Sequence, residues 1–351
     1  MRSVTEEMKF VKYASIENSY RKAFITKIIW ENMKDGEWVV TEKIHGANFS
    51  LWTDGEMVRM AKRTSFIDDE ASFFGIQHIK SDLILNALDL HSGIVGALLS
   101  SLDPSKEIWE PPPIVTIYGE LFGGTYPHPE VEKVANAKKV QKGVYYCPQN
   151  DFIVFDIAVD RQFLSFKRMR ELVEGAGFNC VEELFRGPFR ACLNYRNDFP
   201  STIYKRYDLP KINDNICEGI VIRPEEPRFL FDHSRVMLKS KNAKFAESAS
   251  RKEKVKHVAD LTGGAKEALD AMIVMVTDNR YDSVVSKMGE VAPKDFGPLQ
   301  GAMMKDILSE LMKEGKPYLE YNNLEKAEKS QVNKSVGRKV AELIRRRLIE
   351  V

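Results

Sequence analysis

The segment from Glu42 to Asn48 carries the residues with the clearest capacity for chemistry. It reads Glu-Lys-Ile-His-Gly-Ala-Asn, so Lys43 ends an apolar-flanked strand pattern and Gly46 follows three positions later. A lysine amine attacks phosphorus only when it is neutral, and burial or neighbouring cations favour the neutral form. A glycine at this distance would let the backbone approach a ligand closely. The pattern indicates a nucleophile towards a nucleotide phosphate, although Lys-x-x-Gly alone occurs in many proteins.

Later strand patterns carry polar side chains that an isolated core strand would avoid. The carboxylates are Glu120, Asp156 and Glu218. Lys239 and Lys241 follow at a spacing of two residues, which places both lysines on one face of a strand. Each fragment alone is weak evidence, because alternation at strand ends often produces such fragments. Their order along the chain is what makes them informative.

Apolar strand patterns recur over the first two thirds of the chain. They cover residues 38–40, 48–53, 57–61, 114–121, 152–159, 218–223 and 235–239. Asp54-Gly55, between the second and third patterns, predicts a hairpin. Residues 167–174, followed by Gly-Ala-Gly, predict a helix that ends at a glycine. Hairpins mixed with separate helices, without regular alternation of strand and helix, predict an α+β fold with antiparallel sheets.

The sequence changes character past about residue 254. Apolar residues recur at helical spacing in 265–276, 303–313 and 336–349, and convincing strand patterns disappear. We therefore predict two domains, 1–253 and 254–351, of which the second is all helical. Three consecutive prolines at 111–113 indicate a stiff connection between elements of the first domain.

The overall charge is balanced, with 52 Lys and Arg against 51 Asp and Glu, so no global excess indicates a polyanion partner. One local basic cluster lies between residues 235 and 256. Its cations are Arg235, Lys239, Lys241, Lys244, Arg251, Lys252, Lys254 and Lys256. The cluster is either a nucleic-acid surface or, in its second half, a solvated charged helix face.

The four cysteines are scattered and form no Cys-x-x-Cys pair. This spacing predicts free thiols in a reducing compartment and argues against a structural zinc site. No stretch approaches the roughly 20 apolar residues of a membrane span. We expect an intracellular, cytoplasmic monomer with no membrane partner.

The series Lys-x-x-Gly, Arg, Glu, Phe-Asp, Glu-Gly and Lys-x-Lys is shared by covalent nucleotidyltransferases, which include DNA ligases, RNA ligases and messenger-RNA capping enzymes. More narrowly, the chain resembles the type 2 RNA ligase family of bacteriophages and the related kinetoplastid RNA-editing ligases. The resemblance rests on residues 12–18, 42–50, 61–64, 73–75, 155–157, 286–290 and 293–297, and on Glu120, Glu218, Lys239 and Lys241. The chain departs from the family pattern at Ala47, where threonine is common, and at Arg223, where lysine is common. Residues 81–113 are difficult to align.

This resemblance implies an antiparallel-sheet nucleotidyltransferase domain of the ATP-grasp-like ligase type, followed by a helical C-terminal domain. The implied catalytic residues are Lys43, His45, Glu218, Lys239 and Lys241. The residues implied to bind ATP are Glu42, Lys43, Ile44, Asn48, Arg63, Glu120, Phe155, Val221, Lys239 and Lys241. Phe155 and Val221 would form the walls of an adenine slot.

The resemblance also implies a metal and an RNA partner. Glu120 and Glu218 would hold Mg²⁺ or Mn²⁺, directly or through water. In the helical domain, Arg280, Lys287 and Lys294 are candidate contacts to RNA phosphates.

The implied activity is that of an ATP-dependent RNA ligase in RNA repair. It would seal 3′-hydroxyl and 5′-phosphate ends, with nicks in duplex RNA as the favoured substrate, through a lysyl-AMP intermediate and an adenylylated RNA 5′ end. A DNA ligase or capping-type enzyme is the nearest alternative, but those enzymes usually have aspartate where this chain has His45, and an OB-fold where it has helices. A non-catalytic RNA-binding protein would need one of the catalytic groups to be missing, and all are present.

Overall fold

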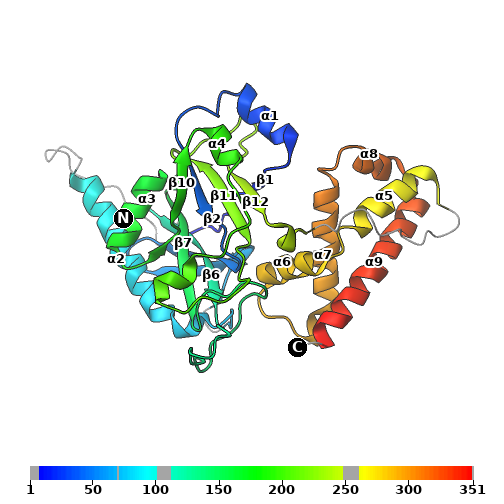
Figure 1. Cartoon of the computed structure of the whole chain (residues 1–351). Coiled ribbons are helices and arrows are strands. Elements are labelled where there is room, and N and C mark those ends of the chain that lie inside the picture. The colour runs from blue at the N-terminus through cyan, green and yellow to red at the C-terminus, as the bar shows by residue number, and fades with distance from the viewer. Residues whose placement is uncertain (1–7, 69–70, 101–111, 248–260, 350–351) are drawn as a thin grey trace. The chain divides into compact units, whose positions relative to one another are not determined.

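The computed structural model describes residues 8–68, 71–100, 112–247 and 261–349. The chain divides into two compact units, Met1–Asn242 and Ala243–Val351. In Figure 1 the first unit carries both sheets, and in the second unit the labelled elements are helices. The predicted boundary between residues 253 and 254 lies outside the described residues.

The first unit contains a five-stranded sheet that is antiparallel except where β1 meets β12. Its order is β1 (Glu17–Asn18), β12 (Leu238–Lys241), β11 (Gly219–Pro224), β2 (Trp38–Glu42) and β10 (Glu183–Gly187). One face of this sheet packs against α1 (Lys22–Trp30) and α4 (Phe189–Leu193), with Trp38, Val40 and Ile222 in the shared core. Because side chains alternate along a strand, Val39, Thr41 and the residues opposite them project from the other face.

The second sheet of this unit has seven strands. Its main order is β5 (Ser65–Phe66), β4 (Val58–Lys62), β3 (Ala47–Thr53), β6 (Val115–Gly123), β7 (Asn150–Val159) and β8 (Gln162–Phe163), and β9 (Asn179–Cys180) pairs with β7 in parallel. The predicted hairpin at Asp54-Gly55 is confirmed, because β3 and β4 pair on either side of it. Helix α3 (Phe166–Gly175) confirms the predicted helix, with Ser165 as its N-cap.

Helix α2 (Lys80–Ser100) occupies much of the segment that resisted alignment. It contacts β3, β4 and α3. Its buried residues Leu83, Ala87, Leu90 and Ile94 recur at helical spacing, which explains why this segment is a helix.

The second unit confirms the predicted helical character. Its helices are α5 (Gly263–Ile273), α6 (Asp278–Met288), α7 (Phe296–Leu311), α8 (Lys316–Asn323) and α9 (Lys326–Ile349). Short 3-10 turns also occur in the chain, at η1 (Ile76–His78), η2 (Ile203–Tyr207), η3 (Ala243–Phe245) and η4 (Pro293–Asp295). Thr262 and Thr277 cap α5 and α6 with their side-chain oxygens. Met272, Met303 and Val336 lie in a common apolar core of this unit.

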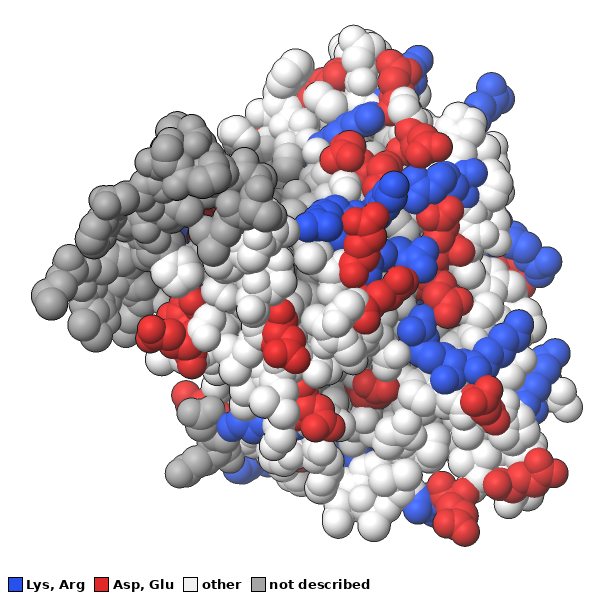
Figure 2. All heavy atoms as spheres, turned by 90° about the vertical axis from the view of Figure 1, so that its left-hand side faces the viewer, with Lys and Arg blue, Asp and Glu red and all other residues white. Residues whose placement is uncertain are grey.

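On the side that carries α2 and α3, the described surface mixes positive and negative side chains. Figure 2 shows Lys and Arg side chains interspersed with Asp and Glu on that side. Ion pairs such as Arg170–Glu174 and Arg206–Glu182 account for part of this mixing. All four cysteines are buried and free, and no described helix is long and apolar enough to cross a membrane.

Candidate active site

The lysine of the Lys-x-x-Gly motif lies at the end of β2, beside β11. Its backbone N–H donates to the Gly219 carbonyl at 2.9 Å, so the ladder continues one residue past the strand. Gly219 in turn lies opposite Lys241 on β12. Lys43, Gly219 and Lys241 therefore form a row across three strands, and the middle position has no side chain. This register brings the two lysines to the same face of the sheet.

Glu218 joins the two lysines of this row. Its Oε2 accepts from Lys43 Nζ at 2.7 Å, and its Oε1 lies 2.9 Å from Lys241 Nζ. His45 Nδ1 lies 3.4 Å from Oε2. Burial alone would raise the pKa of Glu218, but Lys241, Lys43 and His45 outweigh it and hold that pKa well below the ordinary value. A charged carboxylate thus fixes the positions of both lysines.

Two glycines permit this packing. A Cβ on Gly219 would lie 2.1 Å from the Ser240 carbonyl oxygen, and its φ of +149° also disfavours a side chain. A Cβ on Gly46 would lie 2.2 Å from the Leu121 carbonyl oxygen and 2.9 Å from Glu120 Cγ. The glycine of the motif was expected to make room for a ligand. In the structure it makes room for strand β6 and for Glu120.

The seven-stranded sheet contributes a second polar group to the site. Asn48 on β3 lies directly opposite Glu120 on β6, and Arg63 follows the last residue of β4. Burial raises the pKa of Glu120 to about 7, while Lys43 and Arg63 lower it and Glu218 raises it further. Burial lowers the pKa of Arg63, which Tyr13 and Glu120 partly restore. Because Lys43 and Arg63 both shift the pKa of Glu120, these three residues lie in one site.

The two predicted walls of the adenine slot come from different sheets. Val221 on β11 lies opposite Lys239 on β12, so both project from the face that carries Lys43. Phe155 lies on β7 at an irregularity, because Tyr118 pairs with Asp156 while Gly119 pairs with Val154. Phe155 is the extra residue of this β-bulge, and bulges re-aim side chains beside functional sites. Both side chains are half-buried.

Two residues of the motif, Glu42 and Ile44, have buried side chains. Glu42 pairs with Ile220, so its side chain projects from the face opposite to that of Lys43. Its Oε2 accepts from the backbone N–H and the hydroxyl of Thr202 at 2.9 and 2.8 Å. Ile44 is buried. Any contact of Glu42 with ATP would therefore have to come from its backbone, not its carboxylate.

His45 is positioned by its backbone. The His45 N–H donates to the Tyr146 hydroxyl at 2.8 Å, and Tyr146 is fully buried. The sequence offered no reason to single out Tyr146, because a buried tyrosine in an apolar run is usually part of the core.

Asp156, which follows Phe155 on β7, lies in a buried ionic cluster with Tyr13, Arg223 and Arg235. The Tyr13 hydroxyl donates to Asp156 Oδ2 at 2.7 Å, Arg223 lies 3.3 Å from Oδ1, and Arg235 also pairs with Oδ2. Burial would raise the pKa of Asp156, but the two guanidiniums hold it below its ordinary value. The prediction that Arg235 belongs to a surface cluster is wrong, because this side chain is buried and paired with Asp156.

The other members of that basic cluster divide between the site and the undescribed chain. Lys239 and Lys241 lie on β12 in the site. Lys244 lies in η3. The four remaining cations, Arg251, Lys252, Lys254 and Lys256, lie outside the described residues.

The structure separates the three predicted RNA contacts. Arg280 is only 2% exposed, its Nε donates to the Met275 carbonyl at 2.9 Å, and its guanidinium pairs with Asp306. The prediction that Arg280 contacts RNA is therefore wrong for this conformation. Lys287 also pairs with Asp306, at 2.7 Å. Lys294 is exposed in η4.

The buried Glu218 and the half-buried Glu120 are candidate ligands for a divalent metal. Glu218 raises the pKa of Glu120, which shows that the two groups interact electrostatically. Among the described residues, no three or more His, Cys, Asp or Glu side chains group so that they could hold a metal. Mg²⁺ is usually bound by one or two carboxylates, with substrate phosphates and water completing the shell. Glu120 and Glu218 fit that pattern.

Glu120 should make stability depend on pH. Its folded pKa of about 7 exceeds the ordinary 4.5, so the folded state binds this proton more tightly and its stability falls as pH rises between those values. Glu120→Gln keeps the shape without the titration. The free energy of unfolding of the variant minus that of wild type should be about 1–3 kcal/mol larger at pH 8 than at pH 4. Urea unfolding at both pH values measures this, and a pH-independent difference would contradict it.

Two family models match this chain. Residues 36–241 match the family model described as RNA ligase, and residues 259–342 match the model described as T4 RNA ligase 2 C-terminal. The mitochondrial RNA-editing ligase 2 of Trypanosoma brucei brucei is 25% identical over 88% of this chain and 84% of its own. The RNA-editing ligase 1 of the same organism is 25% identical over 79% of this chain and 70% of its own.

Solved structures of Naegleria gruberi RNA ligase are also similar. A mutant with ATP and Mn is 14% identical, covers 67% of this chain and matches with a TM-score of 0.40. The chain spans 57% of that ligase.

The RNA ligase family model identifies the chain as a nucleotidyltransferase type of enzyme. Because the first family model spans more than half of the 351 residues, the chain belongs to the RNA ligase family. The family match and the editing-ligase relatives together support an ATP-dependent RNA ligase, which is the class that the sequence predicts.

Proposed function

We propose that this RNA ligase seals 3′-hydroxyl and 5′-phosphate ends, most readily at nicks in duplex RNA, through a lysyl-AMP intermediate. The observation that carries the proposal is the row Lys43, Gly219 and Lys241, with Glu218 bonded to both lysines. It brings one amine and a second cation to the same face of the sheet. A transferring phosphate needs that combination of nucleophile and positive charge.

In the first step, the formation of lysyl-AMP, each residue of the site would have its own role. Lys43 Nζ must lose its extra proton and then attack the α-phosphorus of ATP, so that a P–N bond forms while the bond to pyrophosphate breaks. Lys241 and Lys239 lie on the same face and would neutralise the phosphate oxygens. His45, beside Glu218, would orient the departing pyrophosphate. Bound Mg²⁺ or Mn²⁺, held by Glu218 and Glu120, would add charge neutralisation.

Recognition of ATP would use both sheets. Phe155 and Val221 would flank the adenine, since both are half-buried and apolar. Arg63 and Glu120 would hold the ribose, and Asn48, opposite Glu120, would add a hydrogen bond.

The later steps move AMP to RNA. The RNA 5′-phosphate would attack the lysyl-AMP phosphorus, which releases Lys43 as an amine. The 3′-hydroxyl would then attack the 5′-phosphorus, which releases AMP and seals the strand. Because RNA must be held on both sides of the break, we propose that the helical unit helps to bind it, with Lys294 as an exposed candidate contact.

A sealing assay tests this function. A duplex RNA with one 5′-labelled nick should be joined in the presence of ATP and Mg²⁺, and a band with the adenylylated 5′ end should appear before the product. The same nick in duplex DNA should be sealed far more slowly. Faster sealing of DNA would identify a DNA ligase, and covalent labelling by GTP in preference to ATP would indicate a capping-type enzyme.

A further inference from the structure

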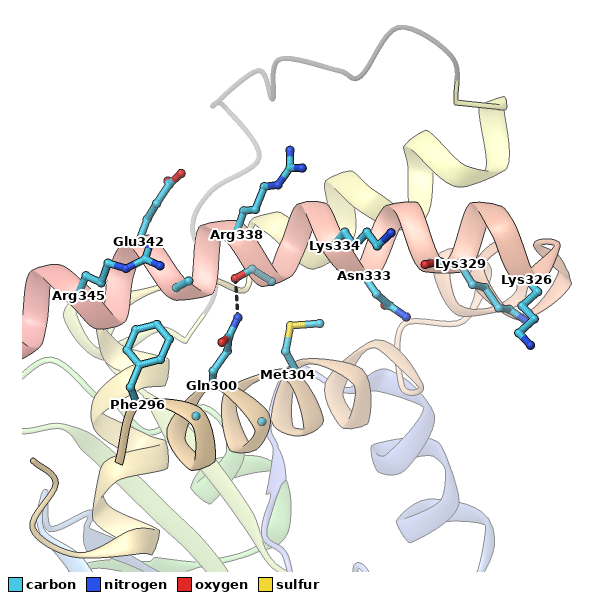
Figure 3. Close-up of a pocket in the computed structure, with 15 residues that line it drawn as sticks. Phe296, Gln300, Met304, Lys326, Lys329, Asn333, Lys334, Arg338, Glu342 and Arg345 are labelled. Carbon is cyan, nitrogen blue, oxygen red and sulfur yellow. Dashed lines mark hydrogen bonds between the residues drawn. The ribbon is translucent and has the colours of Figure 1, made fainter. Parts of the chain in front are cut away.

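A groove runs between α7 and α9 within the helical unit. Its volume is about 1010 Å³. Figure 3 shows Phe296, Gln300 and Met304 on α7 beneath part of α9, and the dashed line marks the hydrogen bond from Gln300 Nε2 to the Gly337 carbonyl at 3.0 Å. This bond ties the two helices together at the middle of the groove. The groove therefore depends on the packing of α7 against α9.

The lining of the groove is strongly basic. Its cations are Lys326, Lys329, Lys334, Arg338 and Arg345. The lining contains one carboxylate, Glu342, and this residue pairs with Lys339 at 3.4 Å. Over the whole chain acids and bases are equal to within one residue, so five cations against one acid is a local excess.

The groove cations differ from other cations of the unit in their partners. Arg280 and Lys287 share Asp306, and Arg346 and Arg347 pair with Asp278. Within the described part of the chain, none of the five groove cations has a carboxylate within 4.0 Å. Lys329 Nζ donates instead to the Asn322 carbonyl at 2.7 Å, and Arg345 lies 5.4 Å from the Phe296 ring centroid. The groove cations are therefore available to bind an anionic partner molecule.

The groove floor is open and its basic row is long. A Cβ added at Gly297 or Gly301 would meet no atom within 4 Å. Residues 326 to 345 of α9 span roughly 28 Å at the rise of an α-helix. An extended polyanion can lie along such a row and contact several cations at once, which a small anion cannot do.

We propose that the groove between α7 and α9 binds the phosphate backbone of the RNA substrate. This inference rests on the proposed RNA ligase function, and it places RNA on residues other than the three that the sequence suggested. Phosphate contacts position an RNA without reading its sequence. The groove therefore accounts for affinity and salt dependence of binding, and not for sequence preference.

The first test removes two rim cations, Lys334 and Arg338, which Figure 3 shows on α9. Lys334→Ala with Arg338→Ala should weaken binding of a fluorescent nicked duplex RNA by about tenfold at roughly 0.15 M salt. It should also reduce the slope of log K against log salt by about two, because two phosphate contacts are lost. Fluorescence anisotropy over a salt series measures both quantities. Both side chains are exposed on a helix, so alanine is compatible with folding.

The matched control is Lys305→Ala with Arg346→Ala. It removes one lysine from α7 and one arginine from α9, and both side chains are exposed and outside the groove lining. This control should bind RNA as wild type does. Equal affinities and equal salt slopes for the two double variants would overturn the proposal.

The second test adds charge to the groove floor. Gly301→Asp places a carboxylate in open space, and Gly301→Asn places an amide of the same shape there. The Asp variant should bind RNA about tenfold more weakly than the Asn variant, with the larger difference at low salt. Identical binding by the pair would count against the groove. Lysyl-AMP formation is measured in parallel: its loss in wild type would contradict the proposed function, whereas normal labelling with unchanged RNA binding would contradict the groove alone.

Discussion

Lys43→Ala is expected to abolish covalent labelling of the protein by ATP that carries the label on its α-phosphate. Lys43 is the amine that the row with Gly219 and Lys241 presents, and alanine leaves no nitrogen to form the P–N bond. The labelled band should fall by at least about 100-fold, to background. Denaturing gel electrophoresis after incubation with labelled ATP and Mg²⁺ gives the measurement.

A lysine outside the site provides the control for this variant. Lys34 is exposed and precedes the same strand, so Lys34→Ala should be labelled as strongly as wild type. The labelled bond in both proteins should break in acid and survive in alkali if it is a phosphoramidate. Undiminished labelling of Lys43→Ala would show that another residue is the nucleophile.

Asp156→Ala is expected to destabilise the first unit by about 3–5 kcal/mol. The change leaves Arg223 and Arg235 buried without their carboxylate, and an uncompensated buried charge is costly. It also removes the acceptor of the Tyr13 hydroxyl. The free energy of unfolding in urea measures the loss.

The control for Asp156 is an ion pair at the surface. Asp198 is exposed and pairs with Arg196, so Asp198→Ala should change stability by less than about 0.5 kcal/mol. If Asp156→Ala cost no more than this control, the cluster would be open to solvent and its charges screened.

The strands around the site could be predicted because their patterns are local. Alternation and a turn pair place β3 and β4 within a residue or two of the predicted ranges. Helix α2 was not predicted, although its buried residues Leu83, Ala87, Leu90 and Ile94 recur at helical spacing. Sheet membership could not be predicted, since it depends on pairs such as β11 with β2 that are distant in sequence.

The site residues were predicted by type more reliably than by environment. Lys43, Glu218 and Lys241 do lie together in the structure, but nothing in the sequence shows that Glu218 bonds to both lysines. Arg280 and Arg235 look like surface cations in the sequence, because a charged residue carries no local mark of its buried partner. The groove between α7 and α9 was not predicted for the same reason. Only the structure shows that no described carboxylate lies within 4.0 Å of its cations.

The Lys43–Glu218 contact also has a consequence for how the protein acquires activity. Its two residues are 175 positions apart in the chain, and the Tyr13–Arg235 contact joins residues 222 positions apart. Contacts of such long range form only after large loops have closed, which costs chain entropy and slows folding. A partly folded intermediate, or a nascent chain that has not yet emerged past β12, cannot hold Lys43 beside Lys241. During refolding, covalent labelling by ATP should therefore recover only as fast as the slowest step in the folding of the first unit. Before that step, the protein should not be labelled.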